Sequence, residues 1–493
     1  MSKKKEILKH TAVYSAANII TQAVGVIGAI LSRKFLGPVQ VGIWAVLQVV
    51  LNFAKYITLG TTTAINIEIP YQIGKKDEKA ADKIKNITFS FITVVSTVVA
   101  IGIIVYAFLF REKLSEELFY GLIFVSIIII LQRINNFFIS ILRAYKNFYI
   151  AGKQMVLSAI INVILVGVLS YFFKIYGFMW ATGLSLIFNI VYIYYHKRYK
   201  FKIACDWKQL KKLILFGLPL RVLGLMGTLF RSIDRIMIIG MIGYRFMGFY
   251  SIAIMACNYL TSIHTSLAVV LLPHFQEKFG EKDDKNDLRK YLSQSAAAFS
   301  DFLPIVIGLT YICAPYFIGL LLKKFVEGIP ALKFLVLSIY FVALGNVYGN
   351  YLITIRKYLV MYPLIIISCI LSVILNYLAI ASGYGIVGVA IATTVSLAFH
   401  FTVIFLAAAS TIFSTVEIVR YYAAIMCKFL LMAALLFSMD RFVMKDELSI
   451  LNVFTCVVIY SFLYIPFLIK MNRDFDVLKN IKERFLKNRQ NAR

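Results

Sequence analysis

Charged residues are scarce in this chain, and their scarcity excludes most soluble folds. Asp, Glu, Lys and Arg make up 15% of the 493 residues, while hydrophobic residues make up 60% and the mean hydropathy is +0.81. A soluble domain typically has about 25% charged and about 45–50% apolar residues, because its water-facing surface has to be polar. Most of the surface of this protein must therefore face lipid.

Paired cysteines and enzyme motifs are absent as well. The six cysteines are scattered singly with no C-x-x-C spacing, so we expect neither a disulfide framework nor a zinc site. The sequence contains no Walker A motif, no H-E-x-x-H and no G-x-S-x-G. We therefore predict that the protein is not an enzyme, binds no cofactor or metal, and has no ATPase of its own.

Long apolar runs predict transmembrane helices. Inside lipid only helices and closed barrels satisfy their backbone hydrogen bonds, and runs of about 20 residues without strict alternation indicate helices. The expected fold class is an all-α polytopic membrane protein with about 14 spans. The predicted spans are residues 11–32, 39–60, 87–110, 118–142, 154–173, 176–195, 213–242, 247–273, 295–322, 331–355, 360–381, 385–408, 419–439 and 448–469.

The distribution of basic residues predicts the topology. The net charge is +28, and Lys and Arg gather in alternate connections if the N-terminus is cytoplasmic. These basic segments are the first ten residues, 75–85, 196–212, 274–294 and 470–493. We therefore expect a bacterial or archaeal plasma-membrane protein with both termini in the cytoplasm. The charge is explained by topology, so no nucleic-acid partner is needed.

The chain contains an internal repeat. The stretch RKFLGPVQVGIWAV from Arg33 resembles IGMIGYRFMGFYSIA from Ile239, and its two glycines align with Gly243 and Gly248. Six predicted spans separate the copies, so both halves keep one orientation, as in the parallel repeats of transporters whose substrate site lies between two lobes. The predicted domains are a first six-helix lobe at 1–200, a second at 201–410, two further helices at 411–470, and a basic tail at 471–493.

Three motifs point to a known family. R-x-x-L-G-P-x-x-x-G from Arg33, D-R-x-x-I-I-G…G-x-Y-x-x-A from Asp234, and Y-G-I-x-G-x-A-x-A-T from Tyr384 resemble the polysaccharide-export (Wzx-type, O-antigen) flippases. These belong to the multidrug/oligosaccharidyl-lipid/polysaccharide (MOP) exporter superfamily. The resemblance implies a V-shaped, MATE-like pair of six-helix lobes. It also implies transport of an undecaprenyl-diphosphate-linked oligosaccharide, with membrane lipid and a downstream polymerase or ligase as partners.

Such a substrate needs fixed positive charge inside the membrane. An isolated diphosphate is very unfavourable in hydrocarbon, and the planar fork of arginine binds phosphate oxygens bidentately. On one continuous helix over 213–242, three arginines would lie within a sector of about 80°. The predicted substrate-binding residues are these three, Arg221, Arg231 and Arg235, together with Lys55, Arg133 and Arg33.

Acidic groups and histidines in the spans are weaker candidates. The carboxylates predicted to couple transport to a proton or sodium gradient, or to serve structurally, are Asp234, Asp301 and Glu68. Membrane potential or consumption of the product are alternative energy sources. His264 and His400 also lie in predicted spans, where a packed neutral histidine is the simpler interpretation.

The basic residues have structural interpretations too. Arg231 and Asp234 fit an intrahelical pair at i, i+3, and Arg221 is near enough to the cytoplasmic end to extend towards water. Arg33 fits an interfacial anchor, and the basic residues of the second and fourth spans fit ion pairs inside the bundle. These alternatives remain open at the level of sequence.

Other functions on related architectures remain alternatives. A peptidoglycan lipid-precursor flippase would share nearly every feature above. A cation-coupled drug antiporter would favour buried carboxylates, whereas here basic residues in the spans outnumber acidic ones. A membrane glycosyltransferase or polymerase would need a large outer loop, and all the predicted outer loops are short.

Overall fold

A computed structural model shows the fold of the chain. The described residues are 3–145, 147–197, 199, 201–262, 286–443 and 449–475. All regular elements among these residues are helices, which confirms the predicted all-α class. The chain forms two compact units, Met1–Ser251 and Ile252–Arg493. The domain boundaries predicted after residues 200, 410 and 470 stay predictions.

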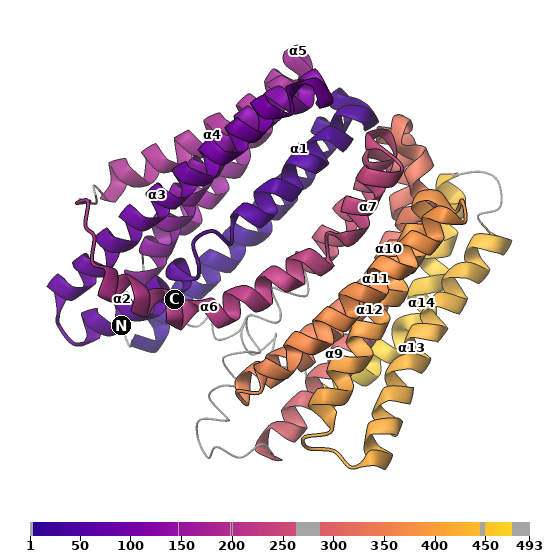
Figure 1. The fold of residues 1–493 in the computed structure, drawn as a ribbon. Coiled ribbons are helices and arrows are strands. Elements are labelled where there is room, and N and C mark those ends of the chain that lie inside the picture. The colour runs from indigo at the N-terminus through magenta and orange to yellow at the C-terminus, as the bar shows by residue number, and fades with distance from the viewer. Residues whose placement is uncertain are drawn as a thin grey trace, which may run out of the picture. The chain divides into compact units, whose positions relative to one another are not determined.

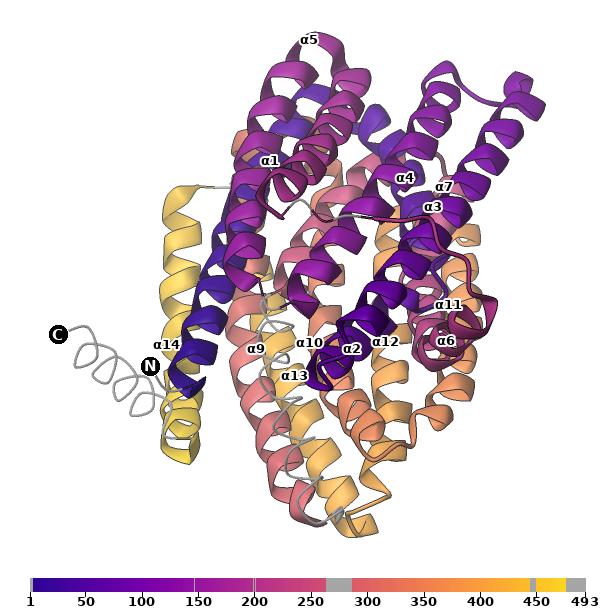
Figure 2. The ribbon, with the colours of Figure 1, turned by 90° about the vertical axis from the view of Figure 1, so that its left-hand side faces the viewer.

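The first unit is built from long helices that pack in pairs. Its elements are α1 (Lys3–Ala54), α2 (Thr61–Gly74), α3 (Glu78–Leu109), the short η1 (Arg111–Lys113), α4 (Glu116–Ala144), α5 (Phe148–Lys197), α6 (Trp207–Phe230) and α7 (Ile233–Met241). Residues 244–262 are also helical. Helix α1 packs along α5, and α3 packs along α4, as Figures 1 and 2 show.

The second unit is a helical bundle around α9 and α10. Its elements are α9 (Asn286–Leu321), η2 (Lys323–Gly328), α10 (Ile329–Thr354), η3 (Tyr358–Val360), α11 (Met361–Ala381), α12 (Gly385–Ala409), α13 (Thr415–Phe442) and α14 (Ile450–Phe475). Helix α12 packs on both α10 and α11, while α9 packs on α10, α13 and α14 (Figure 1).

The helices are long and apolar enough to make this a multi-pass membrane protein. Ten helices among the described residues qualify as spans, and the bent segment from Trp207 to Phe230 makes up to eleven. Elements α1 and α5 each contain two of the predicted spans, because each consists of two helices joined at a kink, at Gly37 (φ 75°) in α1 and at Lys174 (φ 51°) in α5. The total of fourteen spans stays a prediction, because part of the predicted span 247–273 lies outside the described residues. His264 also lies outside them.

Two predicted spans are interrupted, and these predictions were wrong in detail. The span over 39–60 ends at Ala54, because Leu59 (φ 47°) and Gly60 (φ 87°) take left-handed conformations that a helix cannot continue. The span over 213–242 is divided by a turn at Arg231 and Ser232. Hydropathy is averaged over about 19 residues, so a short turn inside an apolar run leaves no trace in it.

The repeat reappears as a reciprocal contact in the first unit. A Cβ on Gly42 would lie 1.8 Å from the carbonyl oxygen of Tyr244, and a Cβ on Gly248 would lie 1.9 Å from that of Pro38. In the sequence repeat Gly42 corresponds to Gly248, and Pro38 to Tyr244. Each copy thus places its glycine against the backbone of the other copy, at a distance that only glycine permits.

We predict that a side chain at either glycine destabilises the protein. Gly42→Ala and Gly248→Ala force the two backbones apart, which should cost about 1–3 kcal/mol each. Thermal unfolding of purified protein in detergent measures this. Gly102→Ala is the control, because a Cβ there meets nothing within 4 Å and alanine favours the helix. Equal melting temperatures for all three variants would show that the close approach is unimportant.

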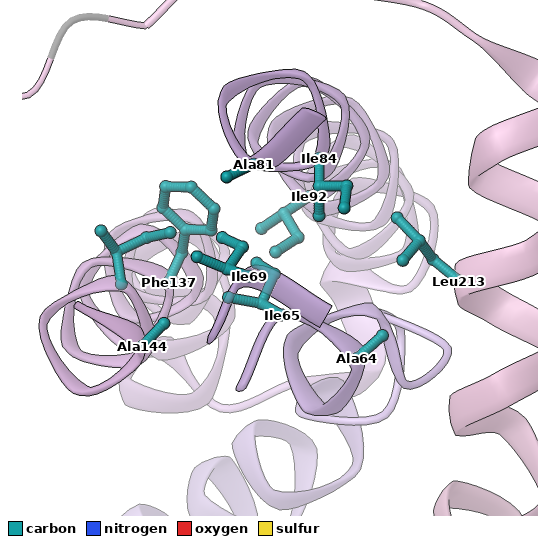
Figure 3. Packing of buried hydrophobic residues seen from close by; sticks show 10 residues of the cluster. Ala64, Ile65, Ile69, Ala81, Ile84, Ile92, Phe137, Ala144 and Leu213 are labelled. Atoms are coloured by element: carbon teal, nitrogen blue, oxygen red, sulfur yellow. The ribbon is translucent and has the colours of Figure 1, made fainter. Parts of the chain in front are cut away.

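Helix α2 is anchored by a small apolar core. Ala64, Ile65 and Ile69 are fully buried between α3 and α4, where they meet Ile84 and Phe137 (Figure 3). Leu213 of α6 joins the same cluster. The core thereby holds the turn at 55–60 next to α6, which matters for the site described below.

The segment before α6 packs against α3. The ring of Phe201 stacks on Phe89 with centroids 4.7 Å apart, and the backbone N–H of Ala204 donates to the Ser90 hydroxyl at 3.0 Å. Asp206 caps α6 and pairs with Lys83 at 2.6 Å. The hydrogen bond from the Lys83 ammonium holds the pKa of the Asp206 carboxyl below its usual value. These contacts fix the position at which α6 begins.

Candidate functional site

Five basic side chains from separate segments gather in the first unit. Lys55 lies in the turn after α1, and the guanidinium groups of four arginines lie within electrostatic range of its ammonium. The four are Arg133 of α4, Arg221 of α6, Arg231 of the turn after α6, and Arg235 of α7. We call these five residues the cationic cluster. Two interrupted helices thus carry most of it, as in transporters whose broken helices hold the ligand.

The cluster runs from an exposed to a buried end. Arg231 is exposed, Lys55, Arg221 and Arg235 are half-buried, and Arg133 is 5% exposed. A charged group buried in this way is unfavourable unless an opposite charge compensates it. The open end gives a ligand access to that charge.

The recorded hydrogen bonds of the cluster are made to neutral oxygens. Arg221 Nη2 donates to the hydroxyls of Thr62 at 3.1 Å and Thr58 at 3.4 Å. Arg133 Nη2 donates to the Gln132 side-chain oxygen at 2.9 Å. The Nε atoms of Arg133, Arg221 and Arg235 are buried and make no hydrogen bond in the described part of the chain. Unused buried donors on cations favour an anionic ligand.

Asp234 is the carboxylate placed beside the cluster. Its oxygens accept hydrogen bonds from the Arg235 backbone N–H at 2.7 Å and from the Tyr250 hydroxyl at 2.9 Å. The i, i+3 pair with Arg231 on one helix is excluded, because α6 ends at Phe230 and α7 begins at Ile233. One carboxylate beside five cations leaves an excess of positive charge.

Three other predicted residues lie in different surroundings. Arg33 donates to the backbone carbonyls of Ala29 at 3.1 Å and Ser251 at 3.2 Å, so it ties α1 to the segment after α7. Glu68 is half-buried on α2. Asp301 is buried in the second unit, where its carboxylate pairs with Lys428 at 2.5 Å.

One aromatic residue of the site was not predicted from the sequence. The ring of Tyr56 lies 5.1 Å from Lys55 Nζ and 5.6 Å from Arg221 Cζ, measured to its centroid. Its hydroxyl reaches α6. Its position next to Lys55 in the sequence was the available signal, but tyrosine is too common in this chain, with 30 residues, for that position to stand out.

Comparison with known proteins identifies the family. Residues 30–330 match the family described as polysaccharide biosynthesis protein. The chain belongs to this family. The match confirms the resemblance to polysaccharide exporters that the sequence motifs indicated. A search of curated proteins gives no match.

Solved structures identify the fold. An inward-facing multidrug resistance MATE family transporter of the MOP superfamily aligns with TM-score 0.67 and 18% identity, covering 84% of this chain and 99% of that one. An outward-facing structure of such a transporter aligns with TM-score 0.63 and 18% identity, covering 82% and 95%. A MOP superfamily transporter from Pyrococcus furiosus, titled for a binding pocket of reverse polarity, aligns with TM-score 0.60 and 19% identity, covering 82% and 95%. This polysaccharide biosynthesis protein therefore has the MOP transporter fold.

We predict that Asp234→Asn makes the thermal stability of the protein depend more on a bound anion. Asparagine keeps one acceptor oxygen for the Arg235 backbone N–H, but its NH2 group cannot accept from the Tyr250 hydroxyl. The negative charge beside Arg235 is also lost, so the cations repel one another more strongly. The variant should melt at a lower temperature than wild type, and inorganic pyrophosphate should raise its melting temperature by more. Differential scanning fluorimetry in detergent measures both.

Asp301→Asn is the matched control for that experiment. It also removes a buried carboxylate from a cation, but in the second unit. We expect a lower melting temperature with the pyrophosphate shift of wild type. An enlarged shift in both variants would mean that pyrophosphate does not act through the cationic cluster.

Proposed function

We propose that this protein is a flippase for an undecaprenyl-diphosphate-linked oligosaccharide, moved from the inner to the outer leaflet of the plasma membrane by alternating access. The observation that carries the proposal is the cationic cluster, which gathers five basic side chains and one carboxylate among membrane-spanning helices. The family match to polysaccharide biosynthesis proteins supports a glycan as cargo.

The chemistry of the cluster suits a diphosphate. Two adjoining phosphates carry several negative charges, which would neutralise much of the mutual repulsion of the cluster. Arg133, Arg221 and Arg235 keep buried N–H donors for phosphate oxygens, and Arg231 is exposed to an arriving ligand. The site would thus be most stable when the diphosphate is bound, which favours loading over idle cycling.

Two other cargoes fit less well. A cationic drug would be repelled by the net positive charge of the cluster. A peptidoglycan lipid precursor carries the same diphosphate, so the cluster does not separate it from a surface polysaccharide unit. The family match favours the polysaccharide.

The transport cycle would need an external source of free energy. We propose a proton or sodium gradient, because the sequence carries no nucleotide-binding motif. A polymerase or ligase that consumes the flipped oligosaccharide would pull the exchange in the same direction.

A reconstitution experiment tests the proposal. Purified protein in proteoliposomes should move a fluorescent undecaprenyl-diphosphate glycan between leaflets, and deleting the gene in its host should make that lipid-linked intermediate accumulate. Failure to flip any polyprenyl-diphosphate glycan, with new sensitivity of the deletion strain to cationic dyes, would favour the drug antiporter instead.

We predict that Arg221→Ala and Arg133→Ala lower the flipping rate at least about tenfold, since each removes a charge-assisted contact with a phosphate. Arg221→Lys should be intermediate, because it keeps the charge and loses the bidentate fork. Arg111→Ala is the control, since Arg111 is exposed in η1 and packs over the ring of Phe119. The same loss in Arg111→Ala would mean that the assay reports stability rather than recognition.

A further inference from the structure

We infer that Tyr56 is a positioning residue of the cationic cluster, whose ring holds Lys55 and Arg221 together as a pair that selects a diphosphate over a monophosphate. The inference rests on the proposed function. Nothing in the sequence motifs or the family match assigns a role to this tyrosine.

The ring is shared by two cations. Lys55 Nζ lies 5.1 Å and Arg221 Cζ 5.6 Å from the centroid of Tyr56. An aromatic ring attracts a cation at this range through its quadrupole, and the attraction grows when water is excluded. The half-buried ring therefore attracts both cations, which offsets part of the repulsion between the two like charges.

The hydroxyl of Tyr56 fixes the ring to α6. It donates to the Gly224 carbonyl oxygen at 2.6 Å and lies 2.5 Å from Thr228 Oγ1. Because its single proton goes to the carbonyl, the threonine hydroxyl is the donor in the second bond. Gly224 and Thr228 follow Arg221 by three and seven residues, so they share its face of the helix. The tyrosine thus anchors the face that carries the arginine.

A second contact anchors the other side of Arg221. A Cβ on Gly60 would lie 2.5 Å from the carbonyl carbon of Gly217, and the backbones approach equally closely in the reverse direction. Gly217 precedes Arg221 by four residues, which is about one helical turn. Arg221 is therefore held between the contact at Gly60 and the hydrogen bonds of Tyr56, both formed by the same turn.

Arg221, held in this way, can still donate a hydrogen bond to a ligand. Its Nη2 donates to Thr58 and Thr62, which are neutral, and its Nε is buried and makes no hydrogen bond in the described part of the chain. A phosphate oxygen would satisfy that donor, while a second phosphate would pair with Lys55. Two cations that share one ring offer a separate contact to each of two linked phosphates, whereas a single phosphate would engage only one of them fully.

Fluorinated phenylalanines at position 56 test the inference. The purified full-length protein binds farnesyl diphosphate or farnesyl monophosphate as the probe, and isothermal titration gives both affinities. Tyr56→Phe keeps the ring but loses the hydroxyl bonds to α6, so its diphosphate affinity should fall by about threefold, and it is the reference for the fluorinated variant. With 3,4,5-trifluorophenylalanine, which has a similar shape but a weakened quadrupole, diphosphate affinity should fall about tenfold below that of Tyr56→Phe. The monophosphate affinity should change much less.

Tyr71 provides the matched control. Its ring also carries a cation, because Lys75 Nζ lies 4.5 Å from the centroid, but at the end of α2. The same fluorinated replacement at Tyr71 should leave both affinities unchanged.

The outcomes separate the inference from the proposed function. Suppose that the wild-type protein binds farnesyl diphosphate but fluorination at position 56 leaves its affinity unchanged, or lowers the diphosphate and monophosphate affinities equally. Either result would overturn the positioning role and leave the flippase proposal standing. A wild-type protein that binds neither probe would overturn the flippase proposal, and the inference with it. A graded loss confined to the diphosphate, at constant melting temperature, is the supporting result.

Discussion

The repulsion among buried cations is the constraint on which the first unit depends. Charges a few ångströms apart interact far more strongly at low dielectric than in water, so a cluster of five basic side chains needs compensation. The protein supplies part of it through Asp234, the Tyr56 ring and the hydroxyls of Thr58 and Thr62. The repulsion that remains is the reason why we propose an anionic ligand for this cluster.

Interrupted helices and glycine contacts place these charges. Lys55 and Arg231 both lie where a helix stops, so their side chains leave the backbone at points that a regular helix would not offer. Gly60 lets the first of these turns touch α6 at Gly217, and Gly42 and Gly248 bring the two repeat copies together. The charges are consequently arranged by backbone contacts that admit no side chain.

Sequence reasoning found the cations but not their arrangement. Composition and apolar runs predicted a helical membrane protein, and the motif at Gly37 predicted the repeat that the reciprocal glycine contact now displays. The arginines of 213–242 were placed on one face of one helix, which was wrong because the helix breaks at Arg231. Averaged hydropathy carries no information about so short a break inside an apolar run.

In the second unit, three basic side chains of the described helices are paired with carboxylates. Helix α13 is tied to its neighbours by ion pairs in which carboxylates meet cations, Asp301 with Lys428, Asp440 with Lys333, and Glu417 with Arg289. One of these pairs, Asp301 with Lys428, lies well inside its two helices, so the protein does balance a basic group where only structure is required. The cationic cluster has one carboxylate for five cations. Since the same chain pairs basic groups with carboxylates elsewhere, the excess of cations in the first unit is the feature from which we propose an anionic ligand.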